Sequence, residues 1–495
     1  MENAIERGKT AIQQALQQIS WQEPFAVTLL RAHEQFVGEV DYRSLFAFWK
    51  TRSVGPPIGD MRYRWELNHR CIPAPVYAGE QDTWEPWREV EQQVFSRDPN
   101  KFEDTLSVPI LTAETCDLLS QLSQKEGPHQ EFALQVLDEA ASVYRQDMAF
   151  HVQGKKAWSD TFALYCLTRY GKTLALLHPF AIAIAAVYAS NAKKTEGVVK
   201  GMRFPFHNVP LVSASAFLAS GLLVLGQELP LISSLLTFVK GQQKESGGWA
   251  DGEHPEDIFT TFAAADLLAH VDPSFETESA CAFLVSRQME AGWWRALGPE
   301  QPWLTGQVMQ WLTSIQRPFP FRYRWPHCAE GQLDRKTHLP FYAYFDDLCR
   351  IFSSLPGLAE AQNEVAFIDL AGFRKFNNTY GQEFGDKVLE VFADELKKLP
   401  ATSAIRDGGD EFLLIGAPTG MQLTTQVQQL RHEWPKRFRQ EFGSEAPPVI
   451  ARILLKRCKG AELLACREAL GRAIGAHKHL TAQDELGIFV DLGVL

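Results

Sequence analysis

Two stretches decide the fold of the C-terminal third of this chain: FIDLAGFRKFNNTYGQEFGDKVLEVF at residues 367–392 and IRDGGDEFLLIG at residues 405–416. Val365–Leu370 is a short apolar run between polar residues, which predicts a buried strand. The second stretch has two adjacent glycines between apolar runs, and such glycines permit positive φ in a tight hairpin. The sequence therefore predicts a strand, a helix and then a hairpin whose turn contains Gly408 and Gly409.

Three carboxylates lie at the expected strand ends: Asp369 in the first strand, and Asp410 and Glu411 directly after the glycines. If these strands are neighbours in one sheet, Asp369 and Asp410 meet at its edge. A carboxylate buried there needs a cation or hydrogen-bond donors. Converging carboxylates suit Mg²⁺, which proteins usually hold with one or two carboxylates together with substrate phosphates. The alternative is an ordinary hairpin turn with solvated acids.

The residues upstream of the turn form a pattern in one register: Asp369, Phe373, Arg374, Asn377, Gly381, Gly385 and Asp386. Together with the Gly-Gly-Asp-Glu-Phe turn, this pattern resembles the GGDEF domain of diguanylate cyclases over residues 334–495. The resemblance implies a palm-like α/β fold that condenses two GTP molecules into cyclic di-GMP. It also implies a homodimer, because a cyclic product needs two GTP sites that face each other.

The resemblance implies a role for each matching position. The expected catalytic and metal-binding groups, for Mg²⁺ or Mn²⁺, are Asp369, the carbonyl of Leu370, Asp410 and Glu411. The expected substrate contacts are Gly372, Phe373 and Arg374 at the triphosphate, Gly408 and Gly409 in the turn, and Asn377 and Asp386 at the guanine. Simpler explanations exist for two of them. Asp386 is also explained as an acid near a helix N-terminus, where the dipole favours it, and Asn377 as a loop residue.

Several positions depart from the family pattern. Phe341 and Tyr342 stand where Asn-Arg is expected, and Asp407 precedes the glycines where an aromatic or aliphatic residue is usual. Ile474 stands at the phosphate-binding lysine, and its place on an apolar helical stripe predicts that it packs inward. Lys478 is the candidate replacement for a missing phosphate-binding arginine. We expect these changes to weaken GTP binding or turnover.

Composition limits the remaining functions. The chain has 495 residues, of which 45% are apolar and 22% charged, which is typical of globular proteins of a few domains. Its net charge of −11 disfavours general binding to nucleic acid or anionic membranes. Scattered cysteines and the absence of a secretory leader indicate the cytoplasm. The apolar stretches at residues 174–189 and 209–239 are interrupted by polar residues and prolines, so they predict buried helices, not membrane spans.

The middle of the chain contains an internal repeat. The pattern Phe238, Gln243, Trp249 and Thr261 recurs at Phe283, Gln288, Trp294 and Thr305, with a period close to 45 residues. This spacing suits a pair of helices per unit. The Gln-x-x-x-x-Gly-Gly-Trp consensus resembles the α/α-toroid repeats of squalene cyclases and prenyltransferases. An unrelated array of helical hairpins is the alternative. If the toroid has a central cavity, its expected apolar lining is Trp249, Trp293, Trp294, Trp303 and Phe262.

The predicted organisation is a multidomain α plus α/β chain: an N-terminal helical region at 1–110, with helices near 3–19 and 24–36, a toroid-like repeat domain at 111–318, a linker at 319–333 and a GGDEF domain at 334–495. The leading hypothesis is a cytoplasmic diguanylate cyclase controlled by a helical module that senses a small apolar ligand or dimerises. The first alternative is a degenerate GGDEF domain that binds GTP without turnover and serves as a signalling interaction module. A weaker one is a terpenoid- or prenyl-processing toroid under nucleotide control, although the chain has no D-x-D-D motif.

Overall fold

The computed structural model describes residues 1–18, 26–38, 40, 113–114, 117–118, 157–201, 208–272, 274–294, 301–316, 333–399, 403–416, 422–443, 446–476 and 488–494. Lys478, the predicted linker apart from Leu333, and most of the predicted N-terminal region lie outside these ranges. The chain divides into two compact units, which we treat separately. The first comprises Met1–Leu268 and Glu276–Gln316, and the second comprises Ala269–Phe275 and Arg317–Leu495.

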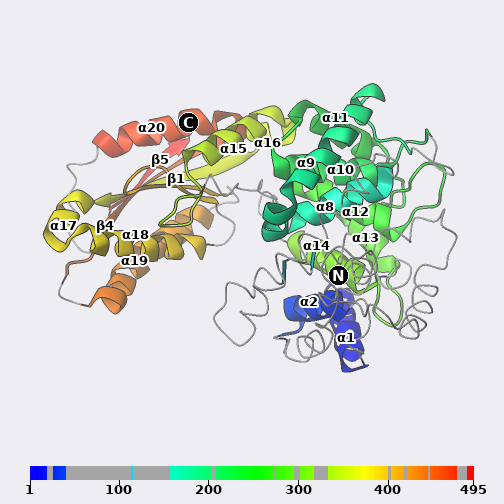
Figure 1. Ribbon diagram of the computed structural model, residues 1–495, viewed down its shortest axis with the longest axis horizontal. Coiled ribbons are helices and arrows are strands. Elements are labelled where there is room, and N and C mark those ends of the chain that lie inside the picture. Colours follow the sequence, from blue (N-terminus) through cyan, green and yellow to red (C-terminus); the bar gives the residue numbers. More distant parts are fainter. Residues whose placement is uncertain are drawn as a thin grey trace, which may run out of the picture. The chain divides into compact units, whose positions relative to one another are not determined.

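The secondary structure described for the first unit is helical, apart from one isolated β-bridge between Lys200 and Pro210 (Figure 1). Its helices are α1 (Glu2–Gln18), α2 (Ala26–Phe36), α8 (Ala157–Arg169), α9 (Gly171–Lys194), α10 (Val212–Leu225), α11 (Leu229–Gly241), α12 (Ile258–Val271), α13 (Glu278–Ser286) and α14 (Gln301–Ser314). The helices predicted near 3–19 and 24–36 are confirmed as α1 and α2. Within the described part of the chain, none of the helices combines the length and apolarity that crossing a bilayer requires.

Helix α10 lies at the centre of this unit. It is apolar around its whole circumference, and all its residues from Val212 to Val224 are buried, as expected for a helix surrounded by others. It ends at Gly226, whose φ of 64° is the left-handed conformation that glycine adopts at low cost. The apolar stretch at residues 209–239 therefore forms two helices, α10 and α11.

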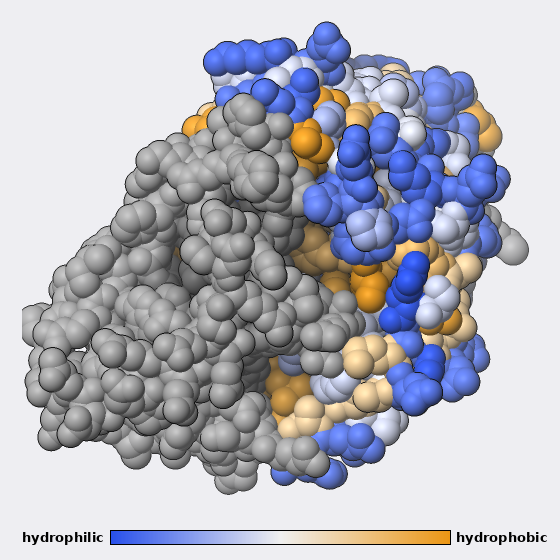
Figure 2. Space-filling view, turned by 90° about the vertical axis from the view of Figure 1, so that its right-hand side faces the viewer, coloured by the Kyte–Doolittle hydropathy of each residue, from blue (hydrophilic) through white to orange (hydrophobic). Residues whose placement is uncertain are grey.

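In the face shown in Figure 2, hydrophobic residues form a band between mostly hydrophilic ones.

The two copies of the repeat make the same hydrogen bonds. Trp249 donates from its indole to the carbonyl ten residues earlier, at 2.8 Å, and from its backbone N–H to Thr261 Oγ1, at 3.0 Å. Trp294 makes the corresponding bonds at 2.6 Å to the carbonyl ten residues earlier and at 3.1 Å to Thr305 Oγ1. Both tryptophans are fully buried. The spacing recurs because each tryptophan joins the two helices of its own repeat.

The repeat glutamines link each unit to the next helix in space. Gln243 Nε2 donates to Ser279 Oγ at the start of α13, at 3.1 Å. Gln288 Nε2 donates to the carbonyl of Ala4 in α1, at 2.8 Å. The glycine four residues after each glutamine packs against the helix that the glutamine contacts. A Cβ on Gly247 would lie 2.2 Å from the carbonyl oxygen of Ser279 in α13, and a Cβ on Gly292 would lie 2.3 Å from that of Arg7 in α1. Helix α1 therefore stands beside the second repeat as α13 stands beside the first.

Aromatic side chains from α8, α10, α12 and α14 meet in one cluster. The ring of Phe162 lies 5.2 Å from that of Phe217, and 5.3 Å from those of Phe259 and Trp303, between ring centroids. Phe262 contacts Trp303 at 6.1 Å. Two residues of the expected cavity lining, Trp303 and Phe262, thus lie in this aromatic cluster, whereas Trp249 and Trp294 bond to backbone within their own repeats. An apolar ligand in this unit stays a prediction.

The second unit contains a five-stranded sheet in the order β2-β3-β1-β4-β5. The strands are β1 (Gln362–Ala371), β2 (Ser403–Arg406), β3 (Glu411–Gly416), β4 (Ile450–Lys459) and β5 (Ile488–Val494). The other elements are α15 (Tyr342–Ser354), α16 (Pro356–Glu360), α17 (Phe373–Tyr380), α18 (Gln382–Lys397), α19 (Gln422–Phe442), the 3₁₀ helix η5 (Gly460–Glu462) and α20 (Leu463–Ala476). Among these five described strands, β4 and β5 pair in parallel and the other neighbours pair antiparallel.

The central strand β1 is buried from Asn363 to Leu370 because helices cover both faces of the sheet. Figure 1 shows α18 and α19 on one face and α15 and α20 on the other. Side chains of β1 such as Ile368 and Leu370 pack with Phe392 of α18 and Trp434 of α19. The side chains that alternate with them, including that of Asp369, project to the face that carries α15 and α20.

Candidate functional site

The strand register brings the two predicted acidic stretches together. Asp369 of β1 is the direct antiparallel partner of Glu411 of β3, and the N–H of Leu370 donates to the carbonyl of Asp410 at 3.1 Å. The expectation that these stretches are neighbours in one sheet is confirmed. The roles of Asp369, Leu370, Asp410 and Glu411 in catalysis and metal binding stay predictions.

Asp369 has a cation partner that the sequence interpretation missed. Its carboxylate accepts a hydrogen bond from Nη1 of Arg452 on β4, where the two residues are direct cross-strand partners. The exposed fractions of the two side chains are only 8% and 7%. A possible signal was a single arginine inside the apolar run of β4, but the register that pairs it with Asp369 depends on contacts between residues 83 positions apart.

The expected Mg²⁺ or Mn²⁺ site does not fit this arrangement. The Asp369 carboxylate already holds a buried guanidinium, so a metal ion there would bind next to a fixed positive charge. While the Asp369–Arg452 pair is intact, these residues do not form the carboxylate site that a divalent cation needs.

The glycine-rich turn is held by hydrogen bonds rather than by positive φ. The predicted hairpin is confirmed by the antiparallel pairing of β2 with β3, and neither Gly408 nor Gly409 uses the positive φ that glycine permits. Arg406 instead donates from Nε to the carbonyl of Gly408, at 3.1 Å, and from Nη2 to that of Gly409, at 2.6 Å. A Cβ on Gly408 would lie 2.8 Å from a carboxylate oxygen of Glu411, whereas Gly409 faces open space. A side chain at position 408 would therefore have to move the Glu411 carboxylate, whereas one at position 409 would meet open space.

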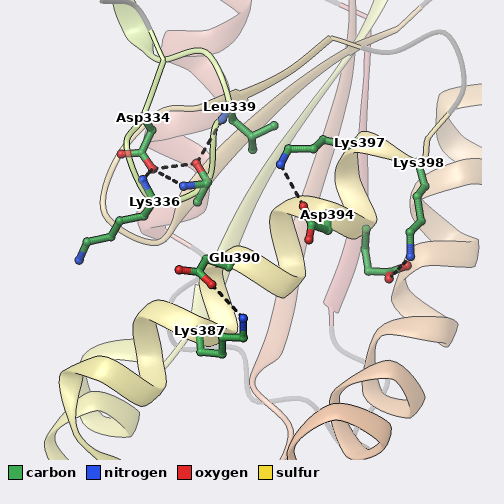
Figure 3. Close-up of polar contacts among 10 residues, drawn as sticks. Asp334, Lys336, Leu339, Lys387, Glu390, Asp394, Lys397 and Lys398 are labelled. Atoms are coloured by element: carbon green, nitrogen blue, oxygen red, sulfur yellow. Dashed lines mark hydrogen bonds and ion pairs between the residues drawn. The ribbon is translucent and has the colours of Figure 1, made fainter. Parts of the chain in front are cut away.

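The third bond of Arg406 fixes the loop that precedes α15. Its Nη1 donates to Asp334 Oδ1 at 2.5 Å, and the same oxygen accepts from the backbone and the hydroxyl of Thr337, each at 2.8 Å. Figure 3 shows Asp334 directed into its own loop. Burial alone would raise the pKa of Asp334, but the bonds from Thr337 and Arg406 hold it below its usual range. His338 in this loop has a φ of 53°, which is uncommon outside glycine.

Two departures from the family pattern belong to one contact. Asp407, just before the glycines, is only 1% exposed at its side chain and pairs with Arg467 of α20 through two hydrogen bonds of 3.0 and 2.6 Å. The guanidinium of Arg467 also lies 4.9 Å from the centre of the Tyr342 ring. The hydrogen bonds to Asp407 raise the pKa of Arg467. This contact fixes the other side of the turn, and Arg467 was not anticipated from the sequence.

The two residues expected at the guanine come from neighbouring helices. Asn377 lies in α17 and Asp386 in the second turn of α18, which begins at Gln382. A Cβ on Gly385 would lie 1.8 Å from Asn377 Oδ1, so only glycine permits this approach. Asp386 accepts from Lys336 Nζ at 2.5 Å. Because it lies beyond the first helical turn, the dipole explanation for this acid loses support.

The residues expected at the triphosphate lie at the start of α17. Gly372 has a φ of 75° and precedes Phe373, the first helical residue. The first backbone N–H groups of a helix have no partner inside it and favour anions. Phe373 is buried and Arg374 is exposed. At the other predicted phosphate contact, Ile474 of α20 is 2% exposed, which confirms that it packs inward and offers no charge.

These features define an α/β domain with a glycine-rich acidic turn at the ends of its central strands. Residues 332–452 match the family model of the diguanylate cyclase GGDEF domain. This part of the chain is therefore a GGDEF domain. Members of the family generally use Mg²⁺ or Mn²⁺.

Curated proteins that this chain resembles include two described as probable diguanylate cyclases. The chain is 36% identical over 81 residues to a probable diguanylate cyclase, DgcF, of Escherichia coli K12, which is 14% of this chain and 26% of the relative. The counterpart in E. coli O157:H7 is also 36% identical over 81 residues, with 17% of its length matched. The match thus spans about a quarter or less of these relatives' length.

Solved structures with a similar domain include the GGDEF domain of DgcB from Caulobacter crescentus in complex with c-di-GMP. It is 23% identical, and the similarity covers 33% of this chain and 97% of that chain with a TM-score of 0.29. The FimX GGDEF domain from Pseudomonas aeruginosa is 17% identical over 32% of this chain and 98% of that chain, also with a TM-score of 0.29.

Proposed function

We propose that this protein acts in cyclic di-GMP signalling through a GGDEF domain that binds GTP with little or no turnover. The observation that carries the proposal is the buried ion pair between Asp369 and Arg452. Formation of cyclic di-GMP requires attack of a ribose 3′-hydroxyl on the α-phosphorus of GTP with departure of pyrophosphate. This reaction depends on neutralising phosphate charge and on positioning the reacting groups.

GTP binding is supported by the parts of the site that the structure brings together. Asn377 and Asp386 lie on adjacent helices, and Gly372 places the N-terminus of α17 beside the strand that carries Asp369. Reduced turnover is supported by the guanidinium at Asp369 and by the buried Ile474. The residues of this chain therefore orient a guanine nucleotide but lack part of the positive charge that would stabilise the reaction.

The second candidate function is an active diguanylate cyclase. The cross-strand pairing of Asp369 with Glu411 favours it, because this register places the acids of both stretches at one site. It requires Arg452 to leave Asp369 when metal and nucleotide bind, and it requires two copies of the chain to bring two GTP molecules together.

One experiment separates the two functions. The full chain is incubated with GTP and Mg²⁺ or Mn²⁺, cyclic di-GMP is measured by chromatography, and GTP binding is measured by calorimetry. Binding without product is the expected result. Product that disappears in Asp410→Ala would select the active cyclase and overturn our proposal, and the absence of both binding and product would remove both functions.

For the first unit we propose a toroid-like repeat module that senses a ligand or dimerises the chain. The matching bonds of Trp249 and Trp294 support a shared repeat, and the convergence of α8, α10, α12 and α14 on one aromatic cluster supports a closed arrangement. Deletion of residues 1–18 tests this idea. If α1 completes the arrangement, the deletion lowers the melting temperature of the helical unit, whereas an unchanged melting curve would contradict it.

A further inference from the structure

The cation that balances Asp369 is part of the chain itself. Arg452 of β4 and Glu411 of β3 are the direct partners of Asp369 on its two sides. Direct partners in antiparallel strands project to the same face, so Glu411, Asp369 and Arg452 form one row across three strands. This row ends at the glycine-rich turn, at the position where the resemblance places a divalent cation.

The ion pair is costly to break. Both side chains are less than one-tenth exposed, and removing one partner of a buried ion pair leaves a charge without compensation. A guanidinium is also a permanent positive charge in proteins. A divalent cation at Asp369 therefore has to displace a permanent counter-charge, which disfavours metal binding at this carboxylate.

We propose that Arg452 takes the place of the divalent cation, so that GTP binds to this domain without metal. This inference rests on the GTP binding proposed above. A guanidinium carries five N–H donors in a planar fork that matches phosphate oxygens. It carries one positive charge rather than two and does not make a bound hydroxyl more acidic as a metal ion does. Arg452 thus supplies positive charge at the position of the metal without the activation that a metal ion would give.

The first test uses the unaltered full chain. GTP is titrated by calorimetry in buffer with EDTA and in buffer with Mg²⁺. The dissociation constants are expected to agree within about twofold, whereas a bridge from metal to carboxylate would make them differ by about tenfold or more. A loss of that size in EDTA would overturn the proposal. This arm needs no variant, so it stands even if changes at Arg452 prevent folding.

The second test needs no nucleotide. Mn²⁺ binding is measured by electron paramagnetic resonance for the wild type, for Arg452→Ser and for the double variant Asp369→Asn/Arg452→Ser. The single variant is expected to gain a Mn²⁺ site that the wild type and the double variant lack. Equal Mn²⁺ binding by wild type and Arg452→Ser would contradict the inference. Should the wild type bind no GTP in either buffer, the proposed function fails, while the Mn²⁺ result still decides the role of Arg452.

Discussion

Three buried aspartates of the helical unit and two of the GGDEF unit are neutralised in different ways, although Asp117 of the helical unit also pairs with an arginine. In the helical unit, Asp251 accepts from the backbone N–H and the hydroxyl of Ser213, and two other buried aspartates accept from tyrosine hydroxyls. In the GGDEF unit, Asp369 and Asp407 pair with arginines. Neutral donors stabilise a carboxylate less than a guanidinium does. The comparison indicates that these aspartates of the helical unit are held by neutral donors, whereas Asp369 and Asp407 beside the glycine-rich turn have guanidinium partners.

The pKa values of two carboxyl groups follow this difference. Burial raises the pKa of Asp251 to about 6, although hydrogen bonds from Ser213 act in the opposite direction. The pKa of Asp334, which bonds to Thr337 and Arg406, is lowered. The following changes test how far this contrast between the units extends.

The largest effect is expected from Trp294→Ala in the helical unit. This change removes a fully buried indole and its bond to the carbonyl of Leu284, so it is expected to lower the free energy of unfolding by about 3–5 kcal/mol. Denaturant unfolding measures it. Trp293→Ala is the matched control. The side chain of Trp293 is only partly buried, so its removal should lower the free energy of unfolding clearly less. Equal losses of unfolding free energy in the two variants would show that the hydrogen bonds of the repeat tryptophan do not contribute to stability.

Arg467→Ala tests the charged pairs of the GGDEF unit. It leaves Asp407 buried without its guanidinium and is expected to cost about 2–3 kcal/mol, below the full value for a buried pair because Arg467 is partly exposed. Arg472→Ala on the same helix is the control. Its partner Glu468 lies 3.9 Å away and both side chains are exposed, so a loss below about 0.5 kcal/mol is expected. Similar losses from the two arginines would remove the distinction between structural and surface pairs.

Asp251 gives the helical unit a distinctive pH dependence. Its pKa is near 6 in the folded state and near its ordinary value when unfolded, so the folded state binds the proton more tightly. This contribution to stability is present at low pH and is lost as pH rises through about 6. Lowering the pH from 7 to 5 is therefore expected to stabilise the wild type by about 1 kcal/mol relative to Asp251→Asn.

The control for this pH dependence is Asp334→Asn, whose effect has the opposite sign. The lowered pKa of Asp334 contributes stability above its unfolded pKa, and this stability is lost as pH falls through the folded pKa. Thermal unfolding from pH 3 to 7 measures both variants against the wild type. If both differences had the same sign, the contrast between the two carboxyl groups would be refuted.

The smallest effect on stability is expected from Lys336→Gln. The pair with Asp386 is partly exposed, so the free energy of unfolding should change by less than about 0.5 kcal/mol. GTP affinity is expected to rise, because Asp386 is then released to accept from the base. Calorimetry measures it, and a decrease would show that Lys336 itself contacts the nucleotide.

Local patterns predicted much of the GGDEF unit. The strand at Val365–Leu370, the hairpin and the burial of Ile474 follow from apolar runs, turn residues and helical spacing within short windows. Arg452 and Arg467 could not be found in this way. Arg452 depends on the strand register and Arg467 on helix packing, and the bonds that define them join residues 83 and 60 positions apart. The bonds from Arg406 to the carbonyls of Gly408 and Gly409, which hold the turn, were likewise not anticipated.

In the helical unit, the repeat identified which tryptophan and threonine matter, because their spacing recurs. It did not indicate that α1 belongs beside the second repeat. Nothing in the residues of α1 repeats the Gln-Gly-Trp pattern, and the neighbour is recognised only through the bond between Gln288 and Ala4.

That bond has a consequence for biosynthesis. Ala4 and Gln288 are 284 residues apart, so the first helix leaves the ribosome long before its docking surface has been translated. During translation it has no native neighbour from the second repeat, and its apolar face is available to chaperones or to other nascent chains. Completion of the helical unit is thus expected to be a late, slow step of folding, set by a contact that spans more than half of the chain.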